Sequence, residues 1–226
     1  MDPTLYVILD RVAARGRDLG DLLDAAIAGG CRLVQLREKE WPSGRLLPLA
    51  GRLRARCTAM GVTFIVNDRV DLALAVGADG VHLGQDDLPA RAARPLLRPG
   101  MILGVSTHSV AQARAAQADG ADYIAVGSMF ATRSKADFEL VGPDLVRKLR
   151  AEIRVPLIGI GGITHDNVEE VIRAGADGVA VISAVSAADD PRAAAERFVA
   201  LIRAARGGAG LDRHPATAIN WRRVNP

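Results

Sequence analysis

Val76-Gly-Ala-Asp-Gly-Val81 decides the fold, because close copies of this stretch occur three more times along the chain. The copies are Ala28-Gly-Gly-Cys-Arg-Leu-Val34, Asp119-Gly-Ala-Asp-Tyr-Ile124 and Ala174-Gly-Ala-Asp-Gly-Val179. Each copy joins a segment with helical spacing to a short apolar run, and four copies favour a closed barrel of four quarters over an open sheet. The glycines fit left-handed caps at helix ends, so the repeat itself is read as structural.

Eight short apolar runs are typical of strands, and the segments between them have the spacing of helices, as in Leu19–Ala28, Arg45–Met60, Val110–Ala118 and Asn167–Ala174. The alternation predicts an α/β fold, a single (β/α)8 TIM barrel over residues 1–206 that ends in a helix over Arg192–Arg206. A flexible C-terminal tail is expected over residues 207–226. The predicted strands are Leu5–Leu9, Leu33–Leu36, Thr63–Val66, Gly80–Leu83, Met101–Leu103, Tyr123–Val126, Pro156–Ile160 and Gly178–Ile182.

The composition is that of a soluble globular enzyme, with 49% apolar and 24% charged residues in 226. No apolar run reaches the length of a membrane span, and the N-terminus lacks a secretory pattern. The net charge is only +3 and no long basic run occurs, which argues against nucleic-acid binding. Cys31 and Cys57 have no metal-ligand spacing. We expect a cytoplasmic protein with no membrane or nucleic-acid partner, and whether it forms a homo-oligomer stays open.

Polar side chains on the second strand point to a ligand site. A period of two places Leu33, Gln35 and Arg37 on one face, and Lys39 continues that face if the chain stays extended. Active sites of such barrels lie at the C-terminal ends of the strands, so Gln35, Arg37 and Lys39 are expected in the barrel mouth around a polyanion. The alternative is a solvated loop, Arg37–Glu40, whose charges pair with one another.

Carboxylates follow the next two strands, in Val66-Asn-Asp68 and Leu83-Gly-Gln-Asp-Asp87. Neighbouring parallel strands are about 4.8 Å apart, so Asp68 and one of the later carboxylates can share a small cation. Two carboxylates without His or Cys ligands suit Mg²⁺, which keeps waters and binds substrate phosphates. The alternative is that Asp68 and Asp87 cap the helices that follow.

Glycines and small polar residues follow the last two strands, in Gly159-Ile-Gly-Gly162 and Val181-Ile-Ser-Ala184. Backbone amides in these loops are the usual phosphate site of a barrel, although glycines needed only for tight turns are the alternative. The polar segment Gly127–Asp137 resembles a lid with donors at Thr132, Ser134 and Lys135. Ser106 adds an inward donor on the fifth strand, and His82 is read as a satisfied core residue.

Taken together, residues 4 to 203 resemble the thiamine-phosphate synthases. Specific motifs carry the resemblance: Val34-Gln-Leu-Arg-Glu-Lys39, Val66-Asn-Asp-Arg-Val-Asp-Leu-Ala-Leu-Ala75, Gly77-Ala-Asp-Gly-Val-His-Leu-Gly-Gln-Asp-Asp-Leu-Pro89, Gly104-Val-Ser-Thr-His108, Thr132-Arg-Ser-Lys135 and Ile160-Gly-Gly-Ile163. The resemblance implies an alkyl transferase that condenses 4-amino-2-methyl-5-hydroxymethylpyrimidine diphosphate with 4-methyl-5-(2-phosphooxyethyl)thiazole, or its carboxylated precursor. Thiamine phosphate and pyrophosphate would form by a dissociative reaction that Mg²⁺ assists.

The resemblance also implies roles for single residues. Asp68 and Asp87 would hold Mg²⁺, and Gln35 and Ser106 would face the pyrimidine, with Lys135, Ser106 and Arg37 as the catalytic residues. The diphosphate would be bound by Arg37, Lys39, Asn67 and Lys135. Contacts to the thiazole phosphate would come from Thr132, Ser134, Gly162, Ile182 and Ser183.

Two features depart from the family pattern. The lid of the family usually reads Pro-Thr-x-Thr-Lys, whereas Ala131 and Ser134 replace the proline and the second threonine here.

Two other functions are compatible with the same barrel: that of a thiazole tautomerase relative, which lacks the residues that bind the diphosphate, and that of a non-catalytic sensor of a phosphate ligand. Asp68, Asp87 and Lys135 together argue against the tautomerase, and the intact pair of metal carboxylates argues against the sensor.

Overall fold

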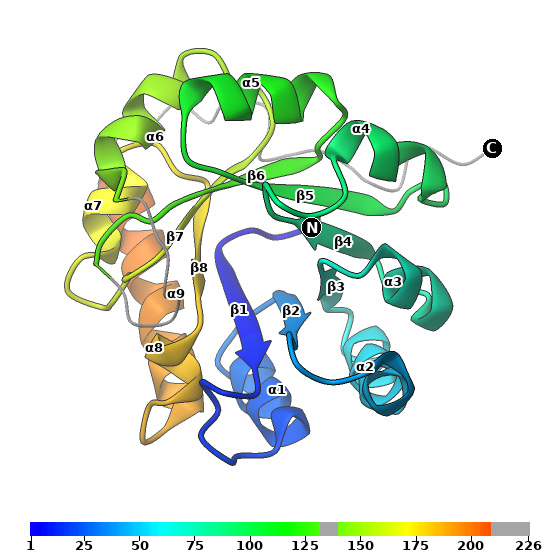
Figure 1. Cartoon of the computed structure of the whole chain (residues 1–226). Helices are drawn as coiled ribbons and strands as arrows, with labels where there is room; N and C mark the ends of the chain where they lie inside the picture. The colour runs from blue at the N-terminus through cyan, green and yellow to red at the C-terminus, as the bar shows by residue number, and fades with distance from the viewer. Residues whose placement is uncertain (132–139, 209–226) are drawn as a thin grey trace.

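The computed structural model describes residues 1–131 and 140–208, and its strands form a closed parallel barrel in sequence order (Figure 1). The first strand pairs with both the second and the last, which closes the barrel and confirms the predicted TIM-barrel fold. The strands are β1 (Leu5–Asp10), β2 (Leu33–Arg37), β3 (Thr63–Asn67), β4 (Gly80–Leu83), β5 (Ile102–Thr107), β6 (Tyr123–Val126), β7 (Leu157–Ile160) and β8 (Gly178–Val181).

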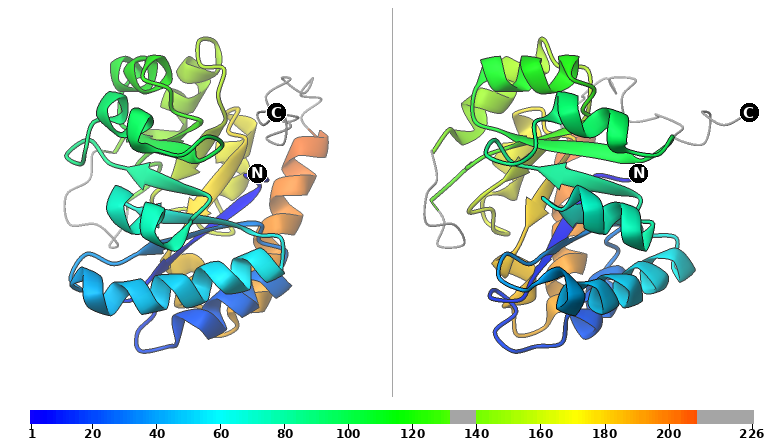
Figure 2. Two further views of the ribbon diagram at one scale, coloured as in Figure 1. Left: turned by 90° about the vertical axis from the view of Figure 1, so that its right-hand side faces the viewer. Right: turned by 45° about the vertical axis from the view of Figure 1, so that its right-hand side comes forward.

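Helices alternate with the strands and surround them on the outside in all three views (Figures 1 and 2). Among the described residues no helix combines the length and the apolar character that a membrane span requires. The helices are α1 (Leu19–Ala28), α2 (Ser43–Ala59), α3 (Val70–Val76), α4 (Ala90–Ala93) with the 3₁₀ turn η1 (Arg94–Leu96), α5 (Val110–Ala118), α6 (Gly142–Arg150), α7 (Val168–Arg173), α8 (Ser183–Ser186) and α9 (Pro191–Gly208).

The predicted helices Arg45–Met60 and Asn167–Ala174 are present as α2 and α7 with ends shifted by one or two residues, and the last two helices show further differences. The last helix, α9, packs against α7 and α1 and so completes the outer ring, and it extends to Gly208, two residues further than expected. The short helix α8 was not predicted, because four residues are too few to show helical periodicity. Residues 209–226, which include most of the predicted tail, lie outside the described residues.

Alternation along the strands divides the core into an inner and an outer layer. On β2, Val34 and Leu36 pack outward against the helices, whereas Leu33 belongs to the layer inside the barrel. This confirms the predicted faces of β2 and directs Gln35 and Arg37 toward the barrel axis. The inner layer consists of Tyr6, Ile8, Leu33, Ile65, Ile102, Tyr123, Ile158 and Ala180.

The structure explains the fourfold repeat by local contacts. The last glycine of each repeat before the strand has a positive φ, at Gly30, Gly77, Gly120 and Gly175, as expected for left-handed caps. In three repeats the aspartate, which lies just before a strand, links that strand to the one preceding it in sequence. The aspartate accepts a hydrogen bond from a backbone N–H near the start of the preceding strand and forms an ion pair with an arginine. These sets are Asp79 with Phe64 and Arg54, Asp122 with Leu103 and Arg94, and Asp177 with Leu157 and Arg150. The structural reading of the repeat is therefore confirmed.

Candidate functional site

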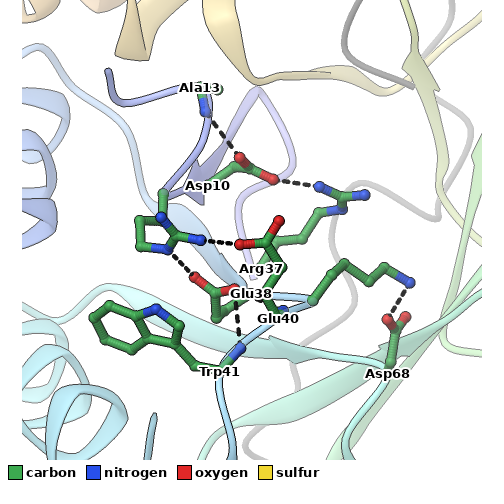
Figure 3. A network of polar contacts seen from close by, with 9 residues as sticks. Asp10, Ala13, Arg37, Glu38, Glu40, Trp41 and Asp68 are labelled. Carbon is green, nitrogen blue, oxygen red and sulfur yellow. Dashed lines mark hydrogen bonds and ion pairs between the residues drawn. The ribbon is translucent and has the colours of Figure 1, made fainter. Parts of the chain in front are cut away.

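The charged side chains at the end of β2 and in the loop after it point in two directions (Figure 3). Arg37 pairs with Asp10 at the end of β1, and Lys39 Nζ lies 2.5 Å from Asp68 Oδ2 after β3. Glu38 and Glu40 turn the other way and both pair with Arg11. The alternative in which the charges of Arg37–Glu40 pair with one another is therefore wrong, and the two cations lie at the C-terminal end of the barrel as predicted.

Asp10 is a site residue that the sequence analysis missed. Its side chain is only 8% exposed, and it accepts hydrogen bonds from Arg37 and from the Ala13 amide at 2.9 Å. Asp10 therefore fixes the Arg37 guanidinium at the barrel mouth. A signal was present, because Asp10 is the polar residue that ends the first apolar run, the same criterion that identified Asn67 and Asp68.

The back of the same segment is anchored by Glu38. Its carboxylate accepts the amides of Glu40 and Trp41 at 2.8 and 3.3 Å and the Arg11 guanidinium at 2.7 Å. Burial acts to raise the pKa of Glu38, but these donors outweigh burial and lower the pKa below its ordinary value. Glu38 is therefore ionised at neutral pH and holds the loop that carries Lys39.

An unusual backbone conformation directs the Asp68 carboxylate. Asp68 has a φ of +59°, and the Arg69 amide donates to the Asn67 carbonyl at 2.7 Å, which makes a tight turn centred on Asp68. The Asp68 amide also donates to the His82 carbonyl on β4 at 2.8 Å. Aspartate tolerates this left-handed region better than most residues, so the turn has a local cause as well as a functional consequence.

The second carboxylate, Asp87, stabilises the loop after β4 and does not cap a helix. Its Oδ2 atom accepts the Gly84 amide at 2.7 Å. The N-cap of α4 is Pro89 and that of α3 is Arg69, and neither makes a side-chain capping bond. The helix-capping interpretation of Asp68 and Asp87 is therefore wrong.

The two carboxylates interact directly. Burial and the hydrogen bond to Asp87 raise the pKa of Asp68 above its ordinary value, although Lys39 opposes the shift. Burial also acts to raise the pKa of Asp87, but the hydrogen bonds from Asp68 and the Gly84 amide lower it. The contact between the two carboxylates thus moves their pKa values in opposite directions, as expected for like charges held close together.

This donor set fits a magnesium ion in its chemistry. Two carboxylates in contact offer hard oxygen ligands, and a cation between them would relieve their mutual repulsion. Within residues 1–131 and 140–208, no third His, Cys, Asp or Glu joins them to complete an all-protein cage. Mg²⁺ commonly takes its remaining ligands from water and substrate phosphates, so the pair suits Mg²⁺ better than a metal that needs a closed cage.

Gln35 and Ser106 lie inside the barrel and are connected through buried side chains. Gln35 Nε2 donates to the Tyr6 hydroxyl at 2.6 Å, and the Ser106 hydroxyl is 2.8 Å from His82 Nε2. Tyr123 lies between Tyr6 and His82, at 2.9 Å from each. His82 is therefore satisfied and buried, as predicted. Tyr6 and Tyr123 were not singled out, although their alternation within strands could have shown that they face inward.

The glycines after β7 serve the packing of the barrel's own loops. Gly161 and Gly162 have φ values of +98° and +64°. A Cβ on Gly161 would lie 2.6 Å from the Ser128 hydroxyl, and one on Gly162 would lie 2.5 Å from the Ala131 carbonyl oxygen. The close approach of the loop after β6 thus explains why both residues are glycine. That their backbone amides bind a phosphate stays a prediction.

The structure describes some of the remaining predicted site residues but not all of them. Ile182 precedes α8 and Ser183 begins it, and β8 pairs with β7, so both residues lie at the same end of the barrel as Gly162. Asn67 ends β3 next to Asp68 and is half-buried. Thr132, Ser134 and Lys135 lie outside the described residues.

Comparisons with known proteins agree with this geometry. A family model described as thiamine monophosphate synthase matches residues 5–185. The chain is 51% identical over 204 residues to the thiamine-phosphate synthase of Moorella thermoacetica, covering 90% of this chain and 97% of the relative. It is 49% identical over 206 residues to that of Methanoculleus marisnigri, covering 89% and 96%. A solved structure, thiamine phosphate pyrophosphorylase from Pyrococcus furiosus, superimposes with a TM-score of 0.83 at 37% identity, covering 90% of this chain and 97% of that one.

Proposed function

The chain belongs to the thiamine monophosphate synthase family, and on this basis we propose how its barrel mouth joins the pyrimidine diphosphate to the thiazole phosphate. The products are thiamine phosphate and pyrophosphate. The observation that carries the proposal is the cluster of Arg37, Lys39, Asp68 and Asp87 at one end of the barrel, where two cations and a carboxylate pair meet.

The diphosphate would lie over this cluster. Arg37 is held in place by Asp10. Its remaining guanidinium hydrogens would donate to phosphate oxygens. Lys39 is about half exposed, so its flexible side chain can exchange Asp68 for a phosphate oxygen without leaving the barrel mouth. The Asn67 amide would add a neutral donor. When bound by Asp68 and Asp87, Mg²⁺ would neutralise charge on the leaving diphosphate.

A dissociative reaction accounts for the chemistry of these side chains. We propose that the bond to the diphosphate breaks first, that the pyrimidine stabilises a methylene cation, and that the thiazole nitrogen then attacks it. Gln35 and Ser106 would orient the pyrimidine, and Lys135 would follow the departing diphosphate. The role of the protein is then to bind, orient and stabilise charge, and no activated Ser, Cys or His nucleophile is required.

The thiazole phosphate would occupy the opposite side of the mouth. The amides of Gly162, Ile182 and Ser183 follow β7 and β8, which is the usual phosphate site of this barrel type. Thr132 and Ser134 would complete the contacts to the same substrate. A cytoplasmic location and a possible homo-oligomer are the remaining parts of the proposal, and the two free, buried cysteines accord with a reducing compartment.

The direct test supplies the purified protein with both substrates, with and without Mg²⁺, and measures pyrophosphate and thiamine phosphate. We expect both products in equal amounts and only with the metal. Binding of the thiazole phosphate without release of pyrophosphate would instead favour a tautomerase-like or sensing role for the barrel.

A further inference from the structure

A continuous chain of hydrogen bonds crosses the barrel interior between the two residues expected to face the pyrimidine. It runs from Gln35 through Tyr6, Tyr123 and His82 to Ser106, with heavy-atom distances of 2.6, 2.9, 2.9 and 2.8 Å. All five side chains are buried, and they come from β2, β1, β6, β4 and β5. Every polar group in such a buried network needs a partner, because a buried group without a hydrogen bond would cost about 1–3 kcal/mol of folding free energy.

Packing holds the rings of this chain in place. Tyr6 meets Tyr123 edge-on, with ring centroids 5.9 Å apart, and His82 stacks on Tyr123 with centroids 5.5 Å apart. Gly104 leaves room for Tyr123, since a Cβ there would lie 2.1 Å from the tyrosine ring. The partners therefore have little freedom to change neighbours, and the hydrogen-bond pattern is set by the fold.

The donors of the chain can be ordered from its first member. The Gln35 amide nitrogen only donates, so the Tyr6 hydroxyl accepts from it and gives its single hydrogen to Tyr123. Tyr123 must then donate to His82 Nδ1, which leaves the imidazole hydrogen on Nε2 to be donated to Ser106. Burial raises the pKa of both tyrosines, so both remain protonated donors.

The reverse order beyond Tyr6 satisfies fewer groups. If His82 Nδ1 donated to Tyr123 and Tyr123 donated to Tyr6, the Tyr6 hydrogen would find no acceptor among the described residues. A buried donor without a partner is rare in folded proteins. One direction therefore makes all four bonds, and it leaves three groups unused by these bonds: the Gln35 amide oxygen, the second hydrogen of the Gln35 amide nitrogen and the Ser106 hydroxyl hydrogen.

We infer that Tyr6, Tyr123 and His82 are positioning residues that fix Gln35 as a hydrogen-bond acceptor and Ser106 as a donor toward the substrate. The inference rests on the proposed function, in which both residues face the pyrimidine. A 4-aminopyrimidine matches this pair, because its amino group donates and its adjacent ring nitrogen accepts. A 4-oxopyrimidine presents the opposite pair, a carbonyl acceptor beside a ring N–H. The network of hydrogen bonds from Gln35 to Ser106 thus favours binding of the 4-aminopyrimidine over the 4-oxopyrimidine.

The state of His82 in the unliganded wild-type protein tests the inference without any variant in the chain. Nitrogen-15 NMR of histidine-labelled protein, with the His82 signals assigned by their loss in a His82→Gln variant, distinguishes the two neutral tautomers and the cation. We expect the neutral form with hydrogen on Nε2. A hydrogen on Nδ1 of the neutral ring would overturn the proposed direction.

Ligand selection gives a second readout that a purely structural role would not change. The probes are the alcohols of the 4-aminopyrimidine and of its 4-oxo analogue, neither carrying a diphosphate, and calorimetry measures their binding. Tyr123→Phe keeps the ring but breaks the chain, so the preference for the amino form should fall roughly five- to tenfold, the value of one hydrogen bond. Thr58→Val removes a hydrogen bond on the outer face of α2 and is the matched control, expected to leave the preference unchanged.

The outcomes separate this inference from the proposed function. If Tyr123→Phe does not fold, Tyr6→Phe breaks the chain beside Gln35 and should lower the preference in the same way. An unchanged preference in a folded chain variant overturns the inference while wild-type turnover stands. If the wild-type protein forms no thiamine phosphate, the proposed function fails, whatever the tautomer of His82.

Discussion

The two sides of the barrel mouth carry different kinds of polar group. On the β1–β4 side, charged side chains meet in pairs, with Arg37 on Asp10, Lys39 on Asp68, and Asp68 beside Asp87. On the β7–β8 side, the predicted contacts are backbone amides around Gly162 and Ser183. Under the proposed reaction, the diphosphate that leaves would be bound by charged side chains, and the phosphate that stays would be bound by backbone amides.

The largest effect should come from breaking the carboxylate pair. Asp68→Asn removes one charge but keeps a residue that tolerates the left-handed turn, so the fold should survive. We expect the rate of metal-dependent pyrophosphate release to fall roughly 10²- to 10³-fold, the usual loss when one electrostatic contact to the transition state is removed. Asp71→Asn, a like change at an exposed carboxylate paired with Arg69, should leave the Mg²⁺ titration as it is. A normal Mg²⁺ titration in Asp68→Asn would remove that residue from the metal site.

The backbone side should respond through stability. Gly162→Ala puts a Cβ 2.5 Å from a carbonyl oxygen in addition to the positive φ, and we expect a loss of about 2–3 kcal/mol in the free energy of unfolding. Gly77 has nearly the same φ, +62°, with nothing within 4 Å of a Cβ, so Gly77→Ala should cost only about 1 kcal/mol. Urea denaturation measures both. Equal losses would show that the close approach of the loop after β6 does not matter.

A smaller effect on stability should follow from weakening the contacts of Glu38, which anchor the loop after β2. Glu38→Gln weakens the contact with Arg11 and should cost about 1 kcal/mol at pH 7. Because the folded-state pKa of Glu38 is lowered, its contribution is present above the unfolded pKa and is lost as pH falls through the folded value. The difference between wild type and variant should therefore shrink below about pH 4.5. Glu152→Gln, at an exposed pair with Arg114, should show little change at pH 7, and a pH-independent difference at Glu38 would contradict the assignment.

The smallest effect is expected at the start of α8. If the Ser183 amide binds the thiazole phosphate, its hydroxyl is dispensable, and Ser183→Ala should change KM for that substrate by less than about threefold. Steady-state kinetics with the thiazole phosphate varied gives the answer. A tenfold or larger rise in KM would place the hydroxyl, and not only the backbone, in the phosphate site.

Sequence patterns predicted the fold because the repeat has local causes. The glycine caps are encoded within each short copy and the aspartates that bind the preceding strand within three of the four, and alternation on β2 gives the inward direction of Gln35. The carboxylate pair followed from the ends of neighbouring strands. Asp10, on a strand that offered no motif, met the same criterion and was overlooked.

Other features depend on contacts that the sequence does not display. The link from Gln35 to Ser106 joins residues on five strands, so no local pattern reveals it. The reason for Gly162 lies in a loop thirty residues earlier, which only the closed barrel brings near. The left-handed turn at Asp68 is compatible with Asn67-Asp68 but is fixed by the hydrogen bond to the His82 carbonyl on β4.

The central claim is that Asp68 and Asp87 hold a divalent metal together with the diphosphate, and metal binding tests it most directly. Electron paramagnetic resonance of Mn²⁺, a substitute for Mg²⁺, gives the metal affinity of wild type and of Asp68→Asn with and without pyrophosphate. We predict that pyrophosphate tightens Mn²⁺ binding to the wild-type protein and has no such effect on the variant. Equal tightening in both proteins would show that the carboxylate pair is not the metal site.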